Sequence, residues 1–513
     1  METRASRFLE FSLLVVLVVH VVAMVSMAVL LMPAMPGAIN TDQVRITYIA
    51  HHPWLWHLGW LPWHLCALSD LLLAIAMLKT PWIPKMPACI TTLFTVLAVA
   101  VEQPAEYLWN VEGARLASVS IAAGTLAPYL DFEGEMFLLV GSIAAILYAI
   151  MAFGWTWSFA RAGTWNRYLT WLSAITWTLL LFTAAAPLLP ESIQPSLLLI
   201  GVGNGIGFSL MALWMVLVLE AVLRRSRPDG LHGQMKPWRH PRSGLLGRIL
   251  TLVGNSRLLR YLGEFLPSTA LISDIEDVIY INFIVDANQL EKLVPPGLSL
   301  QRLGPNGAYG LFSILTYRHG HFGPRFSGGM RNLLSSPVQS NWRIHVQDRN
   351  DVQGIFFVAT VVNDTLVSLG GRSLADGVPM HVASNACVTA SGGSEFLVEL
   401  KPGDGSAPDL YAKLKACPKP QLTGAWQECF GDFNSFLAYC VPQDRAMSTQ
   451  TWYQQSTKQE IDLGIPLESC ESLCGDVVSN SVTDLIGAFS PPICFRVPKV
   501  KFALERVERG SYQ

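Results

Sequence analysis

Six long apolar segments before residue 225 constrain this chain more than any other feature. About 20 apolar residues are needed to cross a bilayer core of about 30 Å as a helix. The chain contains 14% charged residues, whereas soluble proteins contain about 25%. The sequence therefore predicts an α-helical transmembrane bundle over residues 1–225, with candidate spans at Phe11–Met32, Leu55–Leu78, Met86–Val101, Met136–Phe159, Tyr168–Leu189 and Ser196–Leu223.

A seventh stretch, residues 115–130, is only moderately apolar and is rich in Ala, Ser and Gly. Basic residues in short loops mark the cytoplasmic side of a membrane. In this chain, every second segment outside the spans contains more Lys and Arg than its neighbours. The first of these segments holds Arg4 and Arg7, before the first span, and the last holds Arg224 and Arg225, after the sixth. This alternation predicts six spans with both termini in the cytoplasm, and a seventh span would break it. We therefore interpret residues 115–130 as a re-entrant or interfacial segment.

Polar residues within or at the edge of the spans are candidates for function, because burying such groups in lipid is costly. These candidates are His20, His64, Asp70 and Glu102. Several other histidines, at positions 51, 52 and 57, lie beside tryptophans, which favours a place in the interfacial aromatic belt. No HxxxH or HExxH motif accompanies them, so the sequence does not indicate a metal or haem site.

Residues 226–268 are expected to form a basic linker followed by an amphipathic helix. The Pro, Gly and basic residues of 226–243 do not support a helix. From Gly244 to Leu266, apolar residues recur at helical spacing beside Arg248, Arg257 and Arg260. A helix of this type either lies in the membrane interface or packs on the domain that follows it. The sequence leaves both alternatives open.

Residues 269–513 change to short apolar runs with a period of two, separated by Gly, Pro, Asn and Asp. This pattern is typical of strands joined by turns, and it predicts a closed or sandwiched antiparallel sheet. One short helix is expected at Asp286–Leu293, with Asp286 as its N-cap. The cysteines of this region are interpreted as free thiols, because the charge bias places the domain in the reducing cytoplasm.

Three segments of this β-rich region resemble the acetoacetate-decarboxylase-like superfamily, and in particular its branch of uncharacterised bacterial domains. They are INFIVDANQLEKLVPPGLSLQ (281–301), NWRIHVQDRNDVQGIFFVATVV (341–362) and GGRSLADGVPMH (370–381). The resemblance covers residues 277–505 and implies a cone-shaped double sheet or barrel around an apolar pocket. In the decarboxylases, a lysine after a glycine–arginine–glycine–proline bend forms a Schiff base with the substrate. Met380 and His381 stand at those lysine positions, so decarboxylation through an imine is not expected.

The ligand-binding candidates of this domain are Arg343, His345, Arg372, Met380, His381 and Tyr317. Arg343 and His345 alternate onto one face of a predicted strand, where an Arg can hold a carboxylate and a His can exchange protons. The alternative is that these residues have no ligand. Arg343 and His345 would then lie on a solvent-exposed face, and His381 would be a strand residue whose hydrogen bonds are made within the domain. The histidines at 319 and 321 lack a third ligand, so a metal site is not predicted.

The fold class expected is a six-helix transmembrane bundle followed by a mainly-β (α+β) domain over residues 269–513. We interpret the chain as a multi-pass protein of a bacterial inner membrane, whose cytoplasmic domain binds or transforms a small carboxylate or oxo compound. One alternative is a ligand sensor or interaction module without turnover. Another is a transport or redox function of the membrane half. The lipid bilayer is the expected partner, and neither a cofactor nor a nucleic acid is indicated. Enzymatic activity and oligomeric state stay open.

Overall fold

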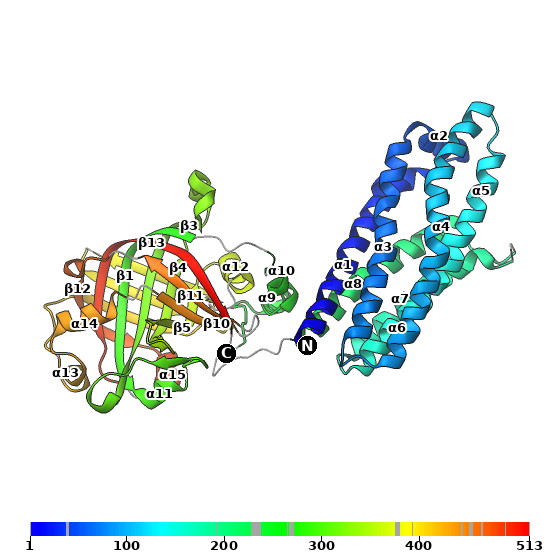
Figure 1. Cartoon of the computed structure of the whole chain (residues 1–513). Helices are drawn as coiled ribbons and strands as arrows, with labels where there is room; N and C mark the ends of the chain where they lie inside the picture. The colour runs from blue at the N-terminus through cyan, green and yellow to red at the C-terminus, as the bar shows by residue number, and fades with distance from the viewer. Residues whose placement is uncertain are drawn as a thin grey trace. The chain divides into compact units, whose positions relative to one another are not determined.

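A computed structural model describes the chain at residues 2–36, 40–190, 192–226, 237–263, 265, 271–374, 380–391, 393–442, 445–450, 455–462, 465–487 and 489–511. The chain divides into two compact units, Met1–Arg227 and Pro228–Gln513. The first unit is helical and the second is built around a large sheet (Figure 1).

Among its described residues, the N-terminal unit contains 6 helices that are long and apolar enough to cross a membrane. This number agrees with the prediction, and the chain is thus a candidate multi-pass membrane protein. The helical elements are α1 (Glu2–Ser26) with η1 (Met27–Leu31) and η2 (Met32–Ala34), α2 (Asp42–His51), α3 (Pro53–Lys79), α4 (Lys85–Ala123), α5 (Ala127–Phe137) with η3 (Leu138–Ala144) and α6 (Ala145–Arg161), α7 (Arg167–Ala185) with η4 (Ala186–Leu188), and α8 (Leu197–Ser226).

The expectation of a re-entrant or interfacial segment at residues 115–130 is wrong. Residues up to Ala123 continue α4, which is one helix of 39 residues. At 1.5 Å per residue, this helix is about 58 Å long and exceeds the thickness of a bilayer core. It ends at Gly124, whose φ of 68° gives the left-handed conformation that closes a helix. Hydropathy alone ended the span at Val101, because it does not detect a helix that continues with small polar residues.

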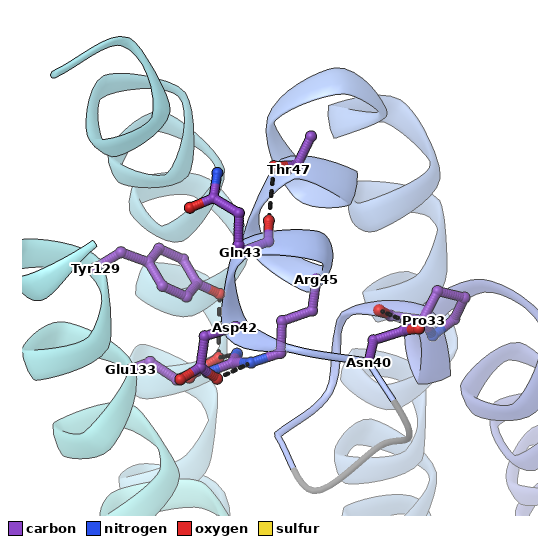
Figure 2. Close-up of polar contacts among 8 residues, drawn as sticks. All are labelled: Pro33, Asn40, Asp42, Gln43, Arg45, Thr47, Tyr129 and Glu133. Carbon is purple, nitrogen blue, oxygen red and sulfur yellow. Dashed lines mark hydrogen bonds and ion pairs between the residues drawn. The ribbon is translucent and has the colours of Figure 1, made fainter. Parts of the chain in front are cut away.

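A buried arginine ties the short helix α2 to α5 (Figure 2). Arg45 is 3% exposed. Its Nε donates to Asp42 Oδ1 at 2.7 Å, and its Nη1 donates to Glu133 Oε1 at 2.6 Å. Tyr129 adds a hydrogen bond to the same Glu133 oxygen at 3.2 Å. Helix α2 was not predicted from the sequence, since its ten residues are too few and too polar to resemble a span.

The C-terminal unit begins with two helices, α9 (Gly244–Gly254) and α10 (Arg257–Gly263), where one amphipathic helix was expected. The break falls at Asn255 and Ser256, directly after Gly254. One side of α9 packs on the unit, since Trp238 lies against Gly254. The other side leaves Leu245 76% and Leu252 72% exposed.

Among the described residues, the strands form one 13-stranded sheet, which is drawn in Figure 1. They are β1 (Leu271–Asp286), β2 (Leu298–Leu300), β3 (Tyr309–Pro324), β4 (Val338–Asp348), β5 (Gln353–Val362), β6 (Met380–Val382), β7 (Asn385–Ser391), β8 (Glu395–Lys401), β9 (Leu410–Ala416), β10 (Arg445–Gln450), β11 (Gln455–Asp462), β12 (Glu471–Val478) and β13 (Ile493–Ser511). Most pairings are antiparallel, as expected, but β5 pairs in parallel with β6 and β10, so the sheet is mixed.

The sheet curls back on itself. Its path runs β1-β3-β4-β5-β10-β11-β13, and β13 also pairs with β1, so these strands close a ring. The remaining strands β12, β9, β8 and β7 extend from β13. This closed path agrees with the barrel-like fold implied by the resemblance. Strand β13 is 19 residues long and pairs with β1, β11 and β12.

The same unit contains several short helices: α11 (Ala287–Glu291), η5 (Pro305–Gly307), η6 (Arg325–Leu333), α12 (Thr365–Leu374), α13 (Ala425–Cys429), α14 (Phe433–Cys440), η7 (Leu467–Ser469) and α15 (Asn480–Ile486). Asp286 caps α11 as predicted, since its side chain accepts from the backbone N–H of Asn288. One face of β1, β3 and β4 shares an apolar core with β7, β8 and β9. The opposite face packs against α13 and α14.

Candidate functional site

Arg343 and His345 lie side by side on one face of β4 and are both buried, with exposures of 2% and 0%. Successive side chains of a strand point to opposite faces. Trp342, Ile344 and Val346 therefore face the apolar core shared with β7–β9. Arg343 stands opposite Ser313 of β3, on the face that α13 and α14 cover.

Helix α14 lies directly over this polar pair. Arg343 Nη2 donates to the carbonyl oxygen of Cys440 at 3.2 Å. The guanidinium carbon lies 5.5 Å from the centre of the Tyr280 ring, within the range of a cation–π contact. The ring of His345 stacks on Tyr439, with 5.0 Å between centroids. The first turn of α14 is fixed by a capping box between Asp432 and Ser435.

Several polar atoms of this face are buried without a hydrogen-bond partner among the described residues: Arg343 Nε, both ring nitrogens of His345, and Thr360 Oγ1. Thr360 of β5 stands opposite Asn341 of β4, two residues from Arg343, so all of these atoms belong to one face. Buried polar groups are normally paired, and a buried charge without a partner is costly. Arg343 has no carboxylate partner in the part of the chain that the structure describes. The face therefore has unmet capacity to donate hydrogen bonds to an anion.

The imidazole of His345 is uncharged near neutral pH. Burial, and second the positive charge of Arg343, hold the pKa of His345 well below its usual value. A neutral imidazole has one N–H donor and one bare nitrogen that accepts. His345 can therefore donate to one ligand atom and accept from another, whereas an imidazolium could only donate.

A chain of hydrogen bonds continues from this face. His319 contacts Ser273 Oγ (Nδ1, 2.8 Å) and Gln339 Oε1 (Nε2, 2.9 Å). The amide of Gln339 donates to Asn341 Oδ1 at 2.8 Å, and Asn341 donates to the Tyr317 hydroxyl at 2.9 Å. Burial lowers the pKa of His319 to about 4 and raises the pKa of Tyr317 above its usual range. This chain holds the Tyr317 hydroxyl against Asn341, which lies two residues from Arg343 on the same face of β4.

The other predicted pocket residues occupy different surroundings. Met380 of β6 stands opposite Thr360 and thus shares its face, where it packs on Gly371. His381 points to the opposite face, where its Nδ1 lies 2.8 Å from Ser406 Oγ. Arg372 Nε donates to the carbonyl oxygen of Gly254 at 2.8 Å. The described partners of His381 and Arg372 are therefore remote from α14.

The expected bend at GGRSLADGVPMH is partly wrong. Its first residues, up to Leu374, form the last turns of helix α12, and Ala375–Pro379 lie outside the described residues. Two glycines in sequence suggested a turn, but the side chain of Met380 fills the space beside Gly371. Without a side chain at 371, the helix can approach strand β6 closely.

The membrane candidates fall into two neighbouring groups. His20 Nε2 lies 3.9 Å from Asp70 Oδ2. His64 Nδ1 lies 3.2 Å from Glu106 Oε2, while Glu102 accepts a hydrogen bond from Tyr148. No group of three potential metal ligands occurs among the described residues. All nine cysteines are free, including those of the β-rich region that the sequence analysis interpreted as free thiols.

Sequence reasoning missed several members of the site: Asn341, Thr360, Tyr439, Cys440 and Gln339. Asn341 and Gln339 alternate with Arg343 along β4, so the period of two could have identified them. The residues of α14 lie about a hundred positions away in sequence, and no local pattern connects them with β4.

Comparison with known families gives a match within the second unit. Residues 273–402 carry a DUF2071 domain. The family is described only as an uncharacterized conserved protein. The DUF2071 domain includes Arg343, His345, Thr360 and Met380, but α14 lies beyond it. No curated protein matches the chain.

Two solved structures illustrate the fold likeness. The enduracididine biosynthesis enzyme MppR, complexed with pyruvate, is 13% identical, with a TM-score of 0.34 over 48% of this chain and 93% of that chain. An acetoacetate decarboxylase-like enzyme from Sphingomonas wittichii RW1 is 10% identical, with a TM-score of 0.34 over 48% of this chain and 97% of that chain. The resemblance expected from the sequence over residues 277–505 overlaps the matched DUF2071 domain at residues 273–402.

Proposed function

We propose that the C-terminal unit binds a small carboxylate or oxo acid at Arg343 and His345. The observation that carries this proposal is the buried guanidinium of Arg343, which has no carboxylate partner among the described residues. A buried cation is stabilised by an anion with which it forms hydrogen bonds, and a carboxylate matches the fork of a guanidinium. The Nε–H of Arg343 and the one ring N–H of the neutral His345 supply donors for it.

Binding would involve α14. Arg343 Nη2 donates a hydrogen bond to the carbonyl oxygen of Cys440, and the ring of Tyr439 stacks on the ring of His345. Nη2 carries two N–H groups, so a carboxylate that takes both Nε and Nη2 of Arg343 would share Nη2 with this carbonyl and lie directly against α14. Because Arg343 and His345 are buried, α14 would then shift as the ligand arrives. This coupling favours the sensor alternative as a second candidate function, because occupancy would change the position of a surface helix without any turnover.

Imine chemistry is not part of the proposal. Met380 shares the face of Thr360, but a thioether cannot form a Schiff base. Lys401 is exposed and paired with Glu399 at 2.9 Å. Lys413 is exposed on β9. Neither lysine has the desolvated surroundings that lower the pKa of an amine enough for nucleophilic attack.

The proposal is tested by titrating the full-length protein in detergent with pyruvate, the simplest 2-oxo acid, and with acetoacetate. We expect saturable heat in calorimetry and a rise in the unfolding temperature of the C-terminal unit. Borohydride added with either compound should leave the intact mass unchanged, because no lysine forms an imine. Absence of binding by every small carboxylate tried would refute the proposed ligand class. A reduced adduct at Lys401 or Lys413 would show that a catalytic lysine exists elsewhere.

We further propose that both termini of this multi-pass protein lie in the cytoplasm, which the alternation of basic loops supports. Alkaline phosphatase fused after Gln513 should be inactive, and green fluorescent protein fused there should fluoresce. A phosphatase fusion after Asn40, in the first loop, serves as the control and should be active. The reverse pattern would invert the topology and place the free cysteines in an oxidising compartment.

A further inference from the structure

A line of polar side chains runs through the membrane unit. Near the start of α3, the exposed His57 lies 2.6 Å from Asn110 (Nδ1 to Oδ1). Further along α3, His64 Nδ1 lies 3.1 Å from Gln103 Oε1 and 3.2 Å from Glu106 Oε2. Gln103 also donates to Glu106 at 3.0 Å. The line therefore starts at an exposed histidine and continues between α3 and α4.

The line reaches Asp70 in the middle of α3. Tyr148 of α6 donates to Glu102, which lies within electrostatic range of both Glu106 and Asp70. Asp70 is 3% exposed, and its Oδ1 has no hydrogen-bond partner among the described residues. Its Oδ2 lies 3.9 Å from His20 Nε2, beyond hydrogen-bond distance. A carboxyl group that is buried and unpaired in this way points to a missing small ligand.

Charge balance identifies that ligand. The part of the line beyond the exposed His57 holds the carboxyl groups of Asp70, Glu102 and Glu106, whereas its only potential cations among the described residues are the imidazoles of His20 and His64. No Lys or Arg contacts these carboxyl groups in the part of the chain that the structure describes. If all three carboxyl groups were ionised, at least one negative charge would stay uncompensated inside the bilayer, which is costly. At least one of them must therefore hold a proton.

We propose that this line is a proton-binding path that enters the membrane unit at His57 and ends at Asp70 and His20. The distance along α3 from residue 57 to residue 70 is about 20 Å at 1.5 Å per residue, or about two thirds of a bilayer core. Beyond Asp70 the buried side of α3 is apolar, with Leu73, Ala74 and Met77. The path is thus open at one end and closed at the other.

The chemistry is proton exchange without electron transfer. A carboxylic acid gives its O–H proton to a neighbouring carboxylate or imidazole nitrogen, and the donor becomes the carboxylate. The groups close enough to Asp70 to interact with its charge are His20 from α1, Cys66 from α3, Glu102 from α4 and Tyr148 from α6. Each bound proton removes one negative charge from the interior of the bundle. An ion that drives coupled transport across a membrane must have this effect on its binding site.

Dicyclohexylcarbodiimide provides the test, because it adds as a whole molecule to protonated carboxyl groups in apolar surroundings. The full-length protein in liposomes is treated at pH 6, 7 and 8, digested, and analysed by mass spectrometry. We expect adducts on Asp70, Glu102 or Glu106, at least fivefold less abundant at pH 8 than at pH 6. Glu133 is the internal control: it is equally buried but is paired with Arg45 at 2.6 Å, so it should stay unlabelled.

Two variants test whether the carboxyl groups exchange protons along one connected path or each react independently. Asp70→Asn should lose the Asp70 adduct and keep any adduct on Glu102. His64→Leu should slow the change in labelling after a pH jump, because it interrupts the path between the surface and Asp70. The proposal is overturned if labelling does not depend on pH, or if Glu133 reacts as readily as the three carboxyl groups. It is also overturned if sodium chloride, but not choline chloride, suppresses labelling at constant pH, since the bound cation would then be sodium.

Discussion

Replacing Arg343 with methionine is expected to abolish carboxylate binding by the C-terminal unit while leaving its fold intact. Removing one partner of a buried, hydrogen-bonded charge pair costs about 2–4 kcal/mol of binding free energy. This corresponds to affinity that is roughly 30- to 700-fold weaker. The stability of the ligand-free protein, in contrast to its affinity, should not fall when Arg343 is replaced. Its buried charge has no carboxylate partner among the described residues, so an apolar side chain of similar length should leave the free energy of unfolding unchanged or raise it by about 1–3 kcal/mol.

Two further variants make the Arg343 experiment decisive. Arg343→Lys keeps the charge but not the forked geometry, so it should retain only weak binding. Arg318→Met, on the adjacent strand β3, removes an exposed arginine and serves as the matched control with unchanged affinity and stability. Calorimetry measures binding, and pulse proteolysis in urea measures unfolding of the C-terminal unit. If Arg343→Met destabilises the free protein by several kcal/mol, Arg343 is a structural residue and its burial needs no ligand.

The C-terminal unit is expected to lose stability steeply as the pH falls below about 6.5. Burial lowers the pKa of His319 to about 4 and the pKa of His345 well below its usual value. Below about pH 6.5 the unfolded chain binds protons on these imidazoles while the folded chain does not, so acid favours unfolding. Each of the two imidazoles should remove about 1.4 kcal/mol per pH unit in this range. Above about pH 7 both contributions vanish, and stability should no longer depend on them.

Urea unfolding of the full-length protein at several pH values checks this expectation. His345→Phe keeps a ring that can stack on Tyr439 and should flatten the acid slope by about half, since His319 alone then contributes. His321→Asn is the control, because His321 is exposed and has a φ of 52°, a conformation that asparagine tolerates. An acid slope unchanged in His345→Phe would mean that His345 is accessible to protons in the folded state.

The architecture could be predicted from the sequence where local patterns determine it. Apolar length fixed six spans, and the period of two along β4 correctly assigned Arg343 and Trp342 to opposite faces. The continuation of α4 to Ala123 could not be predicted from hydropathy, because that part of the helix is stabilised by contacts such as that of Trp109 with Trp56 and Trp60. Tertiary packing overrides composition in this region.

The candidate site was only partly accessible from the sequence for a related reason. Arg343, His345, Tyr317 and Met380 share one face of the sheet, but the helix that covers Arg343 follows β9, far along the chain. The resemblance grouped His381 and Arg372 with them because Arg372 matches the arginine of the family's bend and His381 stands at one of its lysine positions. Alternation along β6 instead sends His381 to the other face, and helix formation turns Arg372 toward Gly254.

The long strand β13 has a consequence for biosynthesis. It closes the ring against β1, and the bond from Asn282 to Ile493 joins residues 211 positions apart. Until residues 493–511 have been synthesised, one edge of β1 has no neighbour to pair with, and open edges invite pairing with other chains. Contacts so distant in sequence also form slowly. By then the six apolar helices have already emerged from the ribosome and can be inserted. A nascent chain tethered to the membrane in this way is kept from diffusing freely, which reduces its encounters with other unfinished sheets while the last strand is completed.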